Sequence, residues 1–223
     1  MPSSAILSYD GTDNDADAVA LGRLLRRANA LDVALAYVRH APEAENRLEV
    51  VERQKAARLL DAGAALLGPP EAERHVVLSA STPEGLAMLA ADLGADLIVF
   101  GSEYRTPEGH VQPGASAQRL LDGGTTAIAV APAGMRDWRD AKINELGSVG
   151  YDGGEAAAGV AASLAGALGG EVSDSPDAAD VLVLGSRPDG PPGQIQLEAA
   201  VRQRLEEAPV PVLVLPVGSA LIF

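Results

Sequence analysis

The chain has 223 residues, of which 47% are hydrophobic and 22% charged, and its formal net charge is −14. Because cysteine is absent, disulfides, thiolate-bound zinc, iron–sulfur clusters and cysteine nucleophiles are excluded. An acidic surface repels nucleic acid, so we expect no nucleic-acid partner. The N-terminus shows no secretory signal, and the longest weakly polar stretch, 156–170, is too short to cross a bilayer. We therefore expect no membrane partner and a cytoplasmic location.

Apolar strands and amphipathic helices are predicted to alternate through the first part of the chain. The predicted strands are 5–9, 33–38, 75–79, 97–100 and 127–131. The predicted helices are one that Thr12 or Asp13 caps, then 43–67, 83–93 and one that begins at Ser116. Regular alternation is typical of a parallel sheet with helices on both faces. We therefore predict a complete five-stranded α/β domain over residues 1–132.

One stretch of the sequence occurs twice. Residues 96–132 and 180–216 each read as an apolar strand ending in Gly-Ser, a loop rich in Gly and Pro, a helix, and a second apolar strand closed by Pro. The glycine that ends the first strand and the closing proline are 31 positions apart in both copies, at 101 and 132 and at 185 and 216. This spacing indicates one structural unit used twice.

The second copy is shorter than the first. Both copies are preceded by a shared marker, Tyr-Asp-Gly at 9–11 and at 151–153, but Asp10 lies 91 positions before Gly101 and Asp152 only 33 before Gly185. We therefore predict a smaller, truncated copy of the same fold over residues 145–223, after a linker at 133–144. Its predicted strands are 148–151, 181–184 and 210–215, and its predicted helices are 154–168 and 198–207.

The residues after the fourth predicted strand suggest an anion site. Gly101-Ser102 follows that buried strand, and Gly114-Ala115-Ser116 opens a helix shortly afterwards. Backbone N–H groups at a helix N-terminus bind anions, and a glycine allows close approach. Asp10, at the carboxyl end of the first strand, would face the same crevice and accept hydrogen bonds from a ribose or a base. An ordinary Gly-Ser turn is the alternative interpretation.

These residues resemble the universal stress proteins, in tandem form. Nucleotide-binding members carry a glycine, two residues, a second glycine, nine residues and then Gly-Ser or Gly-Thr, and Gly101 and Gly114 stand at the matching spacing. Asp10 matches the aspartate that ends the family's first strand, and Val38 matches the valine that meets adenine through its backbone. The resemblance implies strand order 3-2-1-4-5, with a crevice between the first and fourth strands that binds ATP or AMP with Mg²⁺.

The resemblance also implies how the two halves assemble. Family members pair through their fifth strands, so residues 126–131 and 210–215 are expected to run antiparallel as an internal pseudo-dimer, and a homodimer of the whole chain is compatible with this. We expect no catalytic residue, no metal ligand set and at most slow ATP hydrolysis. The candidate nucleotide-binding residues are Ser8, Asp10, Gly11, Thr12, Val38, Gly101, Ser102, Arg105, Gly114, Ala115 and Ser116.

Several positions depart from the family pattern. Tyr104 occupies the place of the second glycine, and Ala115 replaces the hydroxyl residue. In the second copy, Pro188 replaces the second glycine and Glu198-Ala199 stands where Gly-Ser would be. We therefore predict that the second copy binds no nucleotide. For the whole chain, the alternative to nucleotide binding is a stress protein that acts as a protein-interaction module.

Overall fold

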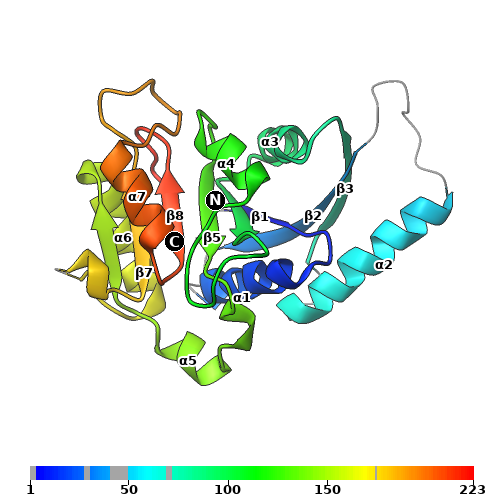
Figure 1. Ribbon diagram of the computed structural model, residues 1–223, viewed down its shortest axis with the longest axis horizontal. Coiled ribbons are helices and arrows are strands. Elements are labelled where there is room, and N and C mark those ends of the chain that lie inside the picture. Colours follow the sequence, from blue (N-terminus) through cyan, green and yellow to red (C-terminus); the bar gives the residue numbers. More distant parts are fainter. Residues whose placement is uncertain (1–3, 28–30, 41–49, 69–71, 174) are drawn as a thin grey trace.

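The strands of the protein form a single sheet. The computed structural model describes residues 4–27, 31–40, 50–68, 72–173 and 175–223. Eight strands follow one another across the sheet in the order β3-β2-β1-β4-β5-β8-β7-β6 (Figure 1). They are β1 Ser4–Ser8, β2 Asp32–His40, β3 Arg74–Ser79, β4 Leu97–Gly101, β5 Ala127–Ala131, β6 Val149–Asp152, β7 Val181–Gly185 and β8 Val212–Leu215.

Helices cover both faces of this sheet. They are α1 Asp13–Arg27, α2 Val50–Leu67, α3 Thr82–Leu93, α4 Ala115–Leu121, α5 Asp140–Glu145, α6 Gly154–Leu168 and α7 Ala199–Glu207, with the 3-10 helices η1 Met135–Asp137 and η2 Pro176–Ala178. One core joins α1, α2 and α6 to one face, and the other joins α3, α4 and α7 to the opposite face. In β4, Leu97 and Val99 enter the first core and Ile98 and Phe100 the second, which is the alternation that a strand buried on both faces requires.

The sequence prediction of the α/β class and of the strand order 3-2-1-4-5 is confirmed, but the prediction of a separate smaller sheet is wrong. Strands β5 and β8 pair antiparallel and join the two halves into one sheet. All residues of both strands are buried. An apolar edge strand left unpaired invites aggregation, and this pairing removes two such edges at once.

The junction of β5 and β8 has a two-fold relationship within one chain. The facing pairs are Ile128 with Val214, Ala129 with Leu213, and Val130 with Val212. Residues 84 positions apart take equivalent places, because Ile98 faces Ile128 in the first half and Leu182 faces Val212 in the second. The adjoining loops repeat this exchange, since Val111 N–H donates to Ala208 at 3.0 Å and Ile195 N–H donates to Gly124 at 2.8 Å.

The shared Tyr-Asp-Gly marker does not mark the same place in the two halves. Asp152 lies within β6 opposite Leu184, whereas Asp10 lies two residues beyond the end of β1. The cause is the length of the turn that follows each strand: residues 9–12 separate β1 from α1, while only Gly153 separates β6 from α6. Gly153 lies close against β7, because a Cβ on Gly185 would be 2.4 Å from its carbonyl oxygen.

The segment predicted as a linker packs against the first half. It contains η1 and most of α5, and Met135 within it is fully buried. The guanidinium group of Arg27, at the end of α1, donates hydrogen bonds to the backbone carbonyls of Ile143, at 2.7 Å, and Leu146. Lys142 stacks its ammonium 3.5 Å from the centre of the Trp138 ring. Residues 133–146 are therefore held along α1.

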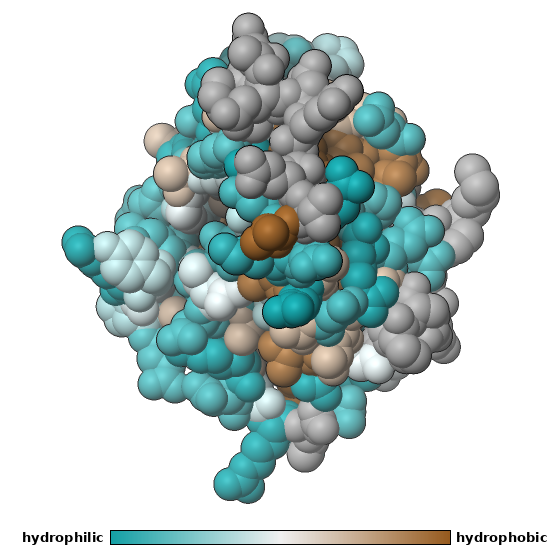
Figure 2. Space-filling view, turned by 90° about the vertical axis from the view of Figure 1, so that its right-hand side faces the viewer, coloured by the Kyte–Doolittle hydropathy of each residue, from teal (hydrophilic) through white to brown (hydrophobic). Residues whose placement is uncertain are grey.

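Within the residues that the structure describes, the second half has no counterpart of α2 and α3, and the segment before β7 packs against β6. Val172 bridges to Val149 at the edge of β6, and η2 packs on Gly150. At the other edge of the sheet, beside β3, the surface is mainly hydrophilic with a few apolar patches (Figure 2). Among the described residues, no helix combines the length and the apolar character that a bilayer crossing needs.

Candidate functional site

A crevice lies at the carboxyl ends of β1 and β4, where the strand order reverses. Ligands of open α/β sheets bind at such points. Its volume is about 750 Å³, and three segments line it: 10–17 at the start of α1, 102–108 after β4, and 133–137 after β5. The crevice is thus formed by the first half together with the segment that leads into the second.

Only some of the predicted site residues line this crevice. Those that do are Asp10, Gly11, Thr12 and Ser102. Those outside its lining are Ser8, Val38, Gly101, Arg105, Gly114, Ala115 and Ser116. Asp17 and the segment after β5 also line the crevice but were not among the predicted site residues. Asp17 lies four residues before the buried Leu21, so an acid on the apolar stripe of a helix was the available signal.

The side chain of Ser102 is bonded within the protein. Its hydroxyl donates to the carbonyl oxygen of Ala131 at 2.7 Å and accepts from the N–H of Gln112 at 3.1 Å, and the residue is fully buried. Ser186 makes the same pair of bonds in the second half, at 2.7 Å to Leu215 and 2.9 Å from Gln196. The Gly-Ser motif therefore fastens each loop to the neighbouring strand.

The two glycines of the predicted phosphate motif differ in their surroundings. A Cβ on Gly101 would lie 1.9 Å from the carbonyl oxygen of Asn14, so this glycine permits the close approach of β4 to α1. Gly114 precedes α4 with an ordinary φ of −70°, and a Cβ there would meet nothing within 4 Å. Packing therefore accounts for Gly101 but not for Gly114.

The loop between β1 and α1 is held by Asp15. One oxygen of its carboxylate accepts the backbone N–H groups of Asp10 at 2.6 Å, Gly11 at 2.9 Å and Thr12 at 3.3 Å. Burial, together with the neighbouring Asp10 carboxyl group, raises the pKa of Asp15 to about 7. The N–H groups that would bind an anion in this loop thus already hold a carboxylate of the protein.

Asp17 forms a buried attachment between α1 and η1. Its carboxylate accepts the backbone N–H groups of Gly134 at 3.2 Å and Arg136 at 2.8 Å, and also the Arg136 guanidinium at 2.9 Å. The residue is 1% exposed, and burial raises its pKa although these three donors favour the ionised form. This attachment fixes one side of the crevice.

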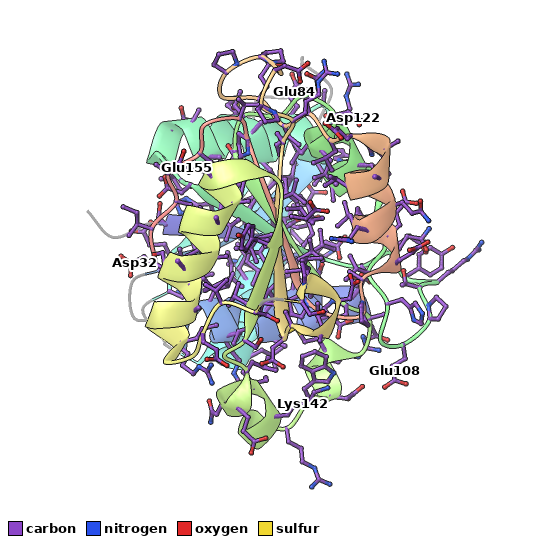
Figure 3. All side chains as sticks on the ribbon, turned by 90° about the vertical axis from the view of Figure 1, so that its left-hand side faces the viewer. Asp32, Glu84, Glu108, Asp122, Lys142 and Glu155 are labelled. Carbon is purple, nitrogen blue, oxygen red and sulfur yellow. The ribbon has the colours of Figure 1, made fainter. Side chains whose placement is uncertain are left out.

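The crevice is acidic. Six carboxyl groups belong to its lining: Asp10, Asp13, Asp17, Glu103, Glu108 and Asp137. Among the lining residues the only basic side chain is that of Arg136, which is already paired with Asp17. Glu108 lies at the outer edge of the molecule (Figure 3). In the described part of the chain, no three acidic or histidine side chains gather closely enough to hold a metal ion.

The loop after β4 exposes an aromatic side chain at the position of the family's second glycine. Tyr104 is 71% exposed, and the Arg105 guanidinium stacks 4.9 Å from the centre of its ring. The backbone N–H of Arg105 donates to the carboxylate of Glu103 at 2.8 Å. Arg105, the basic residue among the predicted nucleotide-binding residues, therefore stacks on the Tyr104 ring and lies outside the crevice lining.

Comparisons with known proteins agree with this fold. A universal stress protein from Archaeoglobus fulgidus has a TM-score of 0.68 at 13% identity, over 96% of this chain and 98% of that one. A functionally unknown protein from Pseudomonas aeruginosa has a TM-score of 0.62 at 12% identity, over 96% and 93%. A search of curated proteins found no match. The model of the universal stress protein family matches residues 6–132, more than half of the chain, which therefore belongs to the universal stress protein family.

Proposed function

We propose that this protein is a non-catalytic, cytoplasmic member of the stress response that acts as a protein-interaction module, and that its crevice holds no nucleotide. The acidic lining of the crevice is the observation that carries this proposal. The phosphates of ATP or AMP are anionic and need donors or cations where they bind. Here six carboxyl groups face one guanidinium that is already paired.

The donors expected to hold phosphate are also engaged. The N–H groups of residues 10–12 bond to Asp15, and the hydroxyl of Ser102 bonds to Ala131. Helix α4, which follows Gly114, has only seven residues and begins with Ala115, which has no hydroxyl. A phosphate would have to displace these internal bonds, and leaving buried polar groups unpaired costs about 1–3 kcal/mol each.

The second half, in this proposal, is an internal partner that replaces a second subunit. The antiparallel β5–β8 junction and the exchanged loop bonds of Val111 and Ile195 support this role. Glu198 precedes α7 at the position that corresponds to Gly114, and a carboxylate there repels phosphate. Asp152, at the end of β6, is paired with Arg204 at 3.0 Å. The second half therefore offers no nucleotide site.

Adenine-nucleotide binding is the competing candidate, and the position of the crevice favours it. The cavity lies at the switch point of the sheet, and the exposed Asp10 at its side is placed to accept hydrogen bonds from a ribose. The lining residues do not fit an uncompensated triphosphate. This candidate therefore requires Mg²⁺ to arrive with the nucleotide and to offset its charge.

Calorimetric titration of the full chain with ATP and with AMP, each with and without Mg²⁺, separates the two candidates. We expect no saturable heat at nucleotide concentrations of about 1 mM. In a Glu103→Gln/Glu108→Gln variant, two like charges are removed, so weak binding of the same nucleotides is expected to increase. One-to-one binding to the unmodified chain that Asp10→Ala abolishes would instead establish the nucleotide site.

A further inference from the structure

The outer side of helix α6 has no cover among the described residues. In Figure 3 this helix faces the viewer at the left, with Glu155 in its first turn. Gly159, Ala162 and Gly166 are exposed along this side, and a Cβ on either glycine would meet nothing within 4 Å. Because these residues are small, a second helix can approach the backbone of α6 closely.

Helix α1 holds the place of α6 in the first half. Both helices pack into the core on the same face of the sheet. Leu21 of α1 corresponds to Ala161 of α6, 140 positions later, and at this offset every buried residue of α6 has a buried counterpart in α1. The reverse does not hold, since α1 is also buried at positions where α6 is exposed.

The additional cover of α1 comes from α2. Val19 corresponds to the exposed Gly159, yet Val19 is only 3% exposed. Gly22 corresponds to the exposed Ala162, yet Gly22 is buried. A Cβ on Gly22 would lie 3.2 Å from the side chain of Leu67 in α2. The positions that bind a helix in the first half are therefore open in the second.

Strand β6, next to α6, is also less covered than its counterpart. Tyr151 holds the place in β6 that Leu7 holds in β1. Leu7 is fully buried, but Tyr151 is 37% exposed. Two strands and two helices stand between α1 and β4, whereas only residues 169–180 connect α6 to β7. This connection is too short to supply the missing helix from the chain itself.

We propose that this open side of the second half binds an amphipathic helix of a partner protein, in the way that α2 lies against α1. We call it the α6 face and define it by Tyr151, Glu155, Gly159, Ala162 and Gly166. Exposed apolar surface of this kind marks an interaction site, and an amphipathic helix is a common occupant. The inference deepens the proposed function and rests on it, because it names the kind of partner that the interaction module binds.

The charges around the α6 face favour a basic helix over a second copy of this chain. Glu155 lies in the first turn of α6 and Glu171 three residues after its end, and both are exposed. Residues 145–223 contain 11 acidic and 3 basic residues, so a second copy would bring like charges to this face. Helix α2 itself combines an apolar side with the exposed basic residues Arg53, Lys55 and Arg58.

A fluorescein-labelled peptide with the sequence of residues 50–67 is the probe, and its fluorescence anisotropy in the presence of the full chain is the measurement. We expect saturable binding with a Kd below about 1 mM. Ala162→Arg places a bulky cation on the α6 face and should weaken binding at least about tenfold. Gln203→Arg, which adds the same charge to the exposed side of α7 on the opposite face of the sheet, should leave the Kd unchanged.

Two further variants test the chemistry of the contact. Glu155→Gln/Glu171→Gln should weaken binding and reduce its dependence on salt, whereas Glu206→Gln/Glu207→Gln, with the same change of net charge on α7, should not. A peptide that carries Leu60→Ser and Leu67→Ser has lost the apolar side that is buried in α2, so it should not bind.

Three results would overturn the proposal. The first is no saturable binding at peptide concentrations up to about 1 mM. The second is a Kd that Ala162→Arg leaves unchanged. The third is self-association of the unmodified chain in sedimentation equilibrium that Ala162→Arg abolishes, because a second copy would then occupy the α6 face. None of these results depends on nucleotide, so the calorimetric titration tests the empty crevice separately.

Discussion

Asp17 on α1 and Arg136 on η1 are joined by two hydrogen bonds, 2.8 Å from the backbone N–H and 2.9 Å from the guanidinium. The two residues are 119 positions apart in the chain. With the N–H of Gly134 as a third donor, this carboxylate ties the start of the connecting segment to the first helix. The contact therefore connects one wall of the crevice to the segment that links the two halves of the sheet.

Asp17→Ala should therefore destabilise the protein markedly. The substitution leaves the buried N–H of Gly134 and the N–H of Arg136 without an acceptor, which should lower the free energy of unfolding by about 1–3 kcal/mol. Arg136→Ala is the matched control. It keeps both backbone bonds and removes a guanidinium that is 38% exposed, so its cost should stay below about 1 kcal/mol. Urea denaturation measures both, and equal losses would show that the ion pair rather than the backbone cap holds the segment.

Stability should fall as the pH rises from about 4 to about 7 because of Asp15. Its pKa is raised from 3.8 in the unfolded chain to about 7 in the folded one, so the folded state binds the proton more tightly. The contribution is complete near the unfolded pKa and is lost as the pH rises through the folded pKa. One such group changes the free energy of unfolding by at most about 1.4 kcal/mol per pH unit.

The comparison with Asp15→Asn isolates this effect. Urea denaturation of both proteins at several pH values between about 5 and 8 should show the unmodified chain losing stability relative to the variant as the pH rises. Asp17, whose pKa is also raised by burial, is present in both proteins and cancels in the difference. A stability difference that stays constant over this range would contradict the raised pKa of Asp15.

The regular parts of the fold were predictable because their signals are local. Apolar runs bounded by Gly and Pro predicted the strands, and their alternation with helices predicted a parallel sheet covered on both faces. The order of the first five strands was implied by the family resemblance. The resemblance to the universal stress proteins implied the antiparallel pairing of β5 with β8, which the structure confirms. The Tyr-Asp-Gly marker suggested that Asp10 and Asp152 occupy equivalent places, which is wrong. A motif this short does not show how long the turn after the strand is. Asp152 therefore falls inside β6 although its sequence neighbours match those of Asp10.

The site was harder to predict because its properties depend on burial and on distant contacts. Asp15 and Asp17 lie near the start of α1, where acids are commonly exposed to solvent, yet both are buried. Residues 133–137 read as part of a charged linker without periodicity, although Met135 is in the core. Ser102 matched a ligand motif, but its partner Ala131 is 29 positions away. Sequence composition does not reveal which polar groups form hydrogen bonds within the protein and are therefore not available to a ligand.

The role of Gly101 is open to a direct test. Gly101→Ala would place a methyl group 1.9 Å from the backbone carbonyl of Asn14, which cannot move without shifting α1. Overpacking of this kind costs about 1–3 kcal/mol or more. Gly114→Ala meets nothing within 4 Å, so its effect should stay within about 0.5 kcal/mol. Thermal unfolding followed by circular dichroism compares the two, and similar midpoints would mean that Gly101 is not required for packing.

The packing of η2 onto the second half depends on Gly150. A Cβ at this position would lie 2.7 Å from Cα of Pro176 and 2.9 Å from Cβ of Ala179, so the missing side chain is what lets η2 pack onto β6. Gly150→Ala should lower the free energy of unfolding by about 1–3 kcal/mol. Gly159→Ala, on the exposed side of α6 with nothing within 4 Å, should instead raise it by about 0.5–1 kcal/mol through helix propensity. Chemical denaturation measures the free energy of unfolding of both variants. If it changed in the same direction in both, η2 would be able to shift without cost, and β6 would not need η2 to be buried.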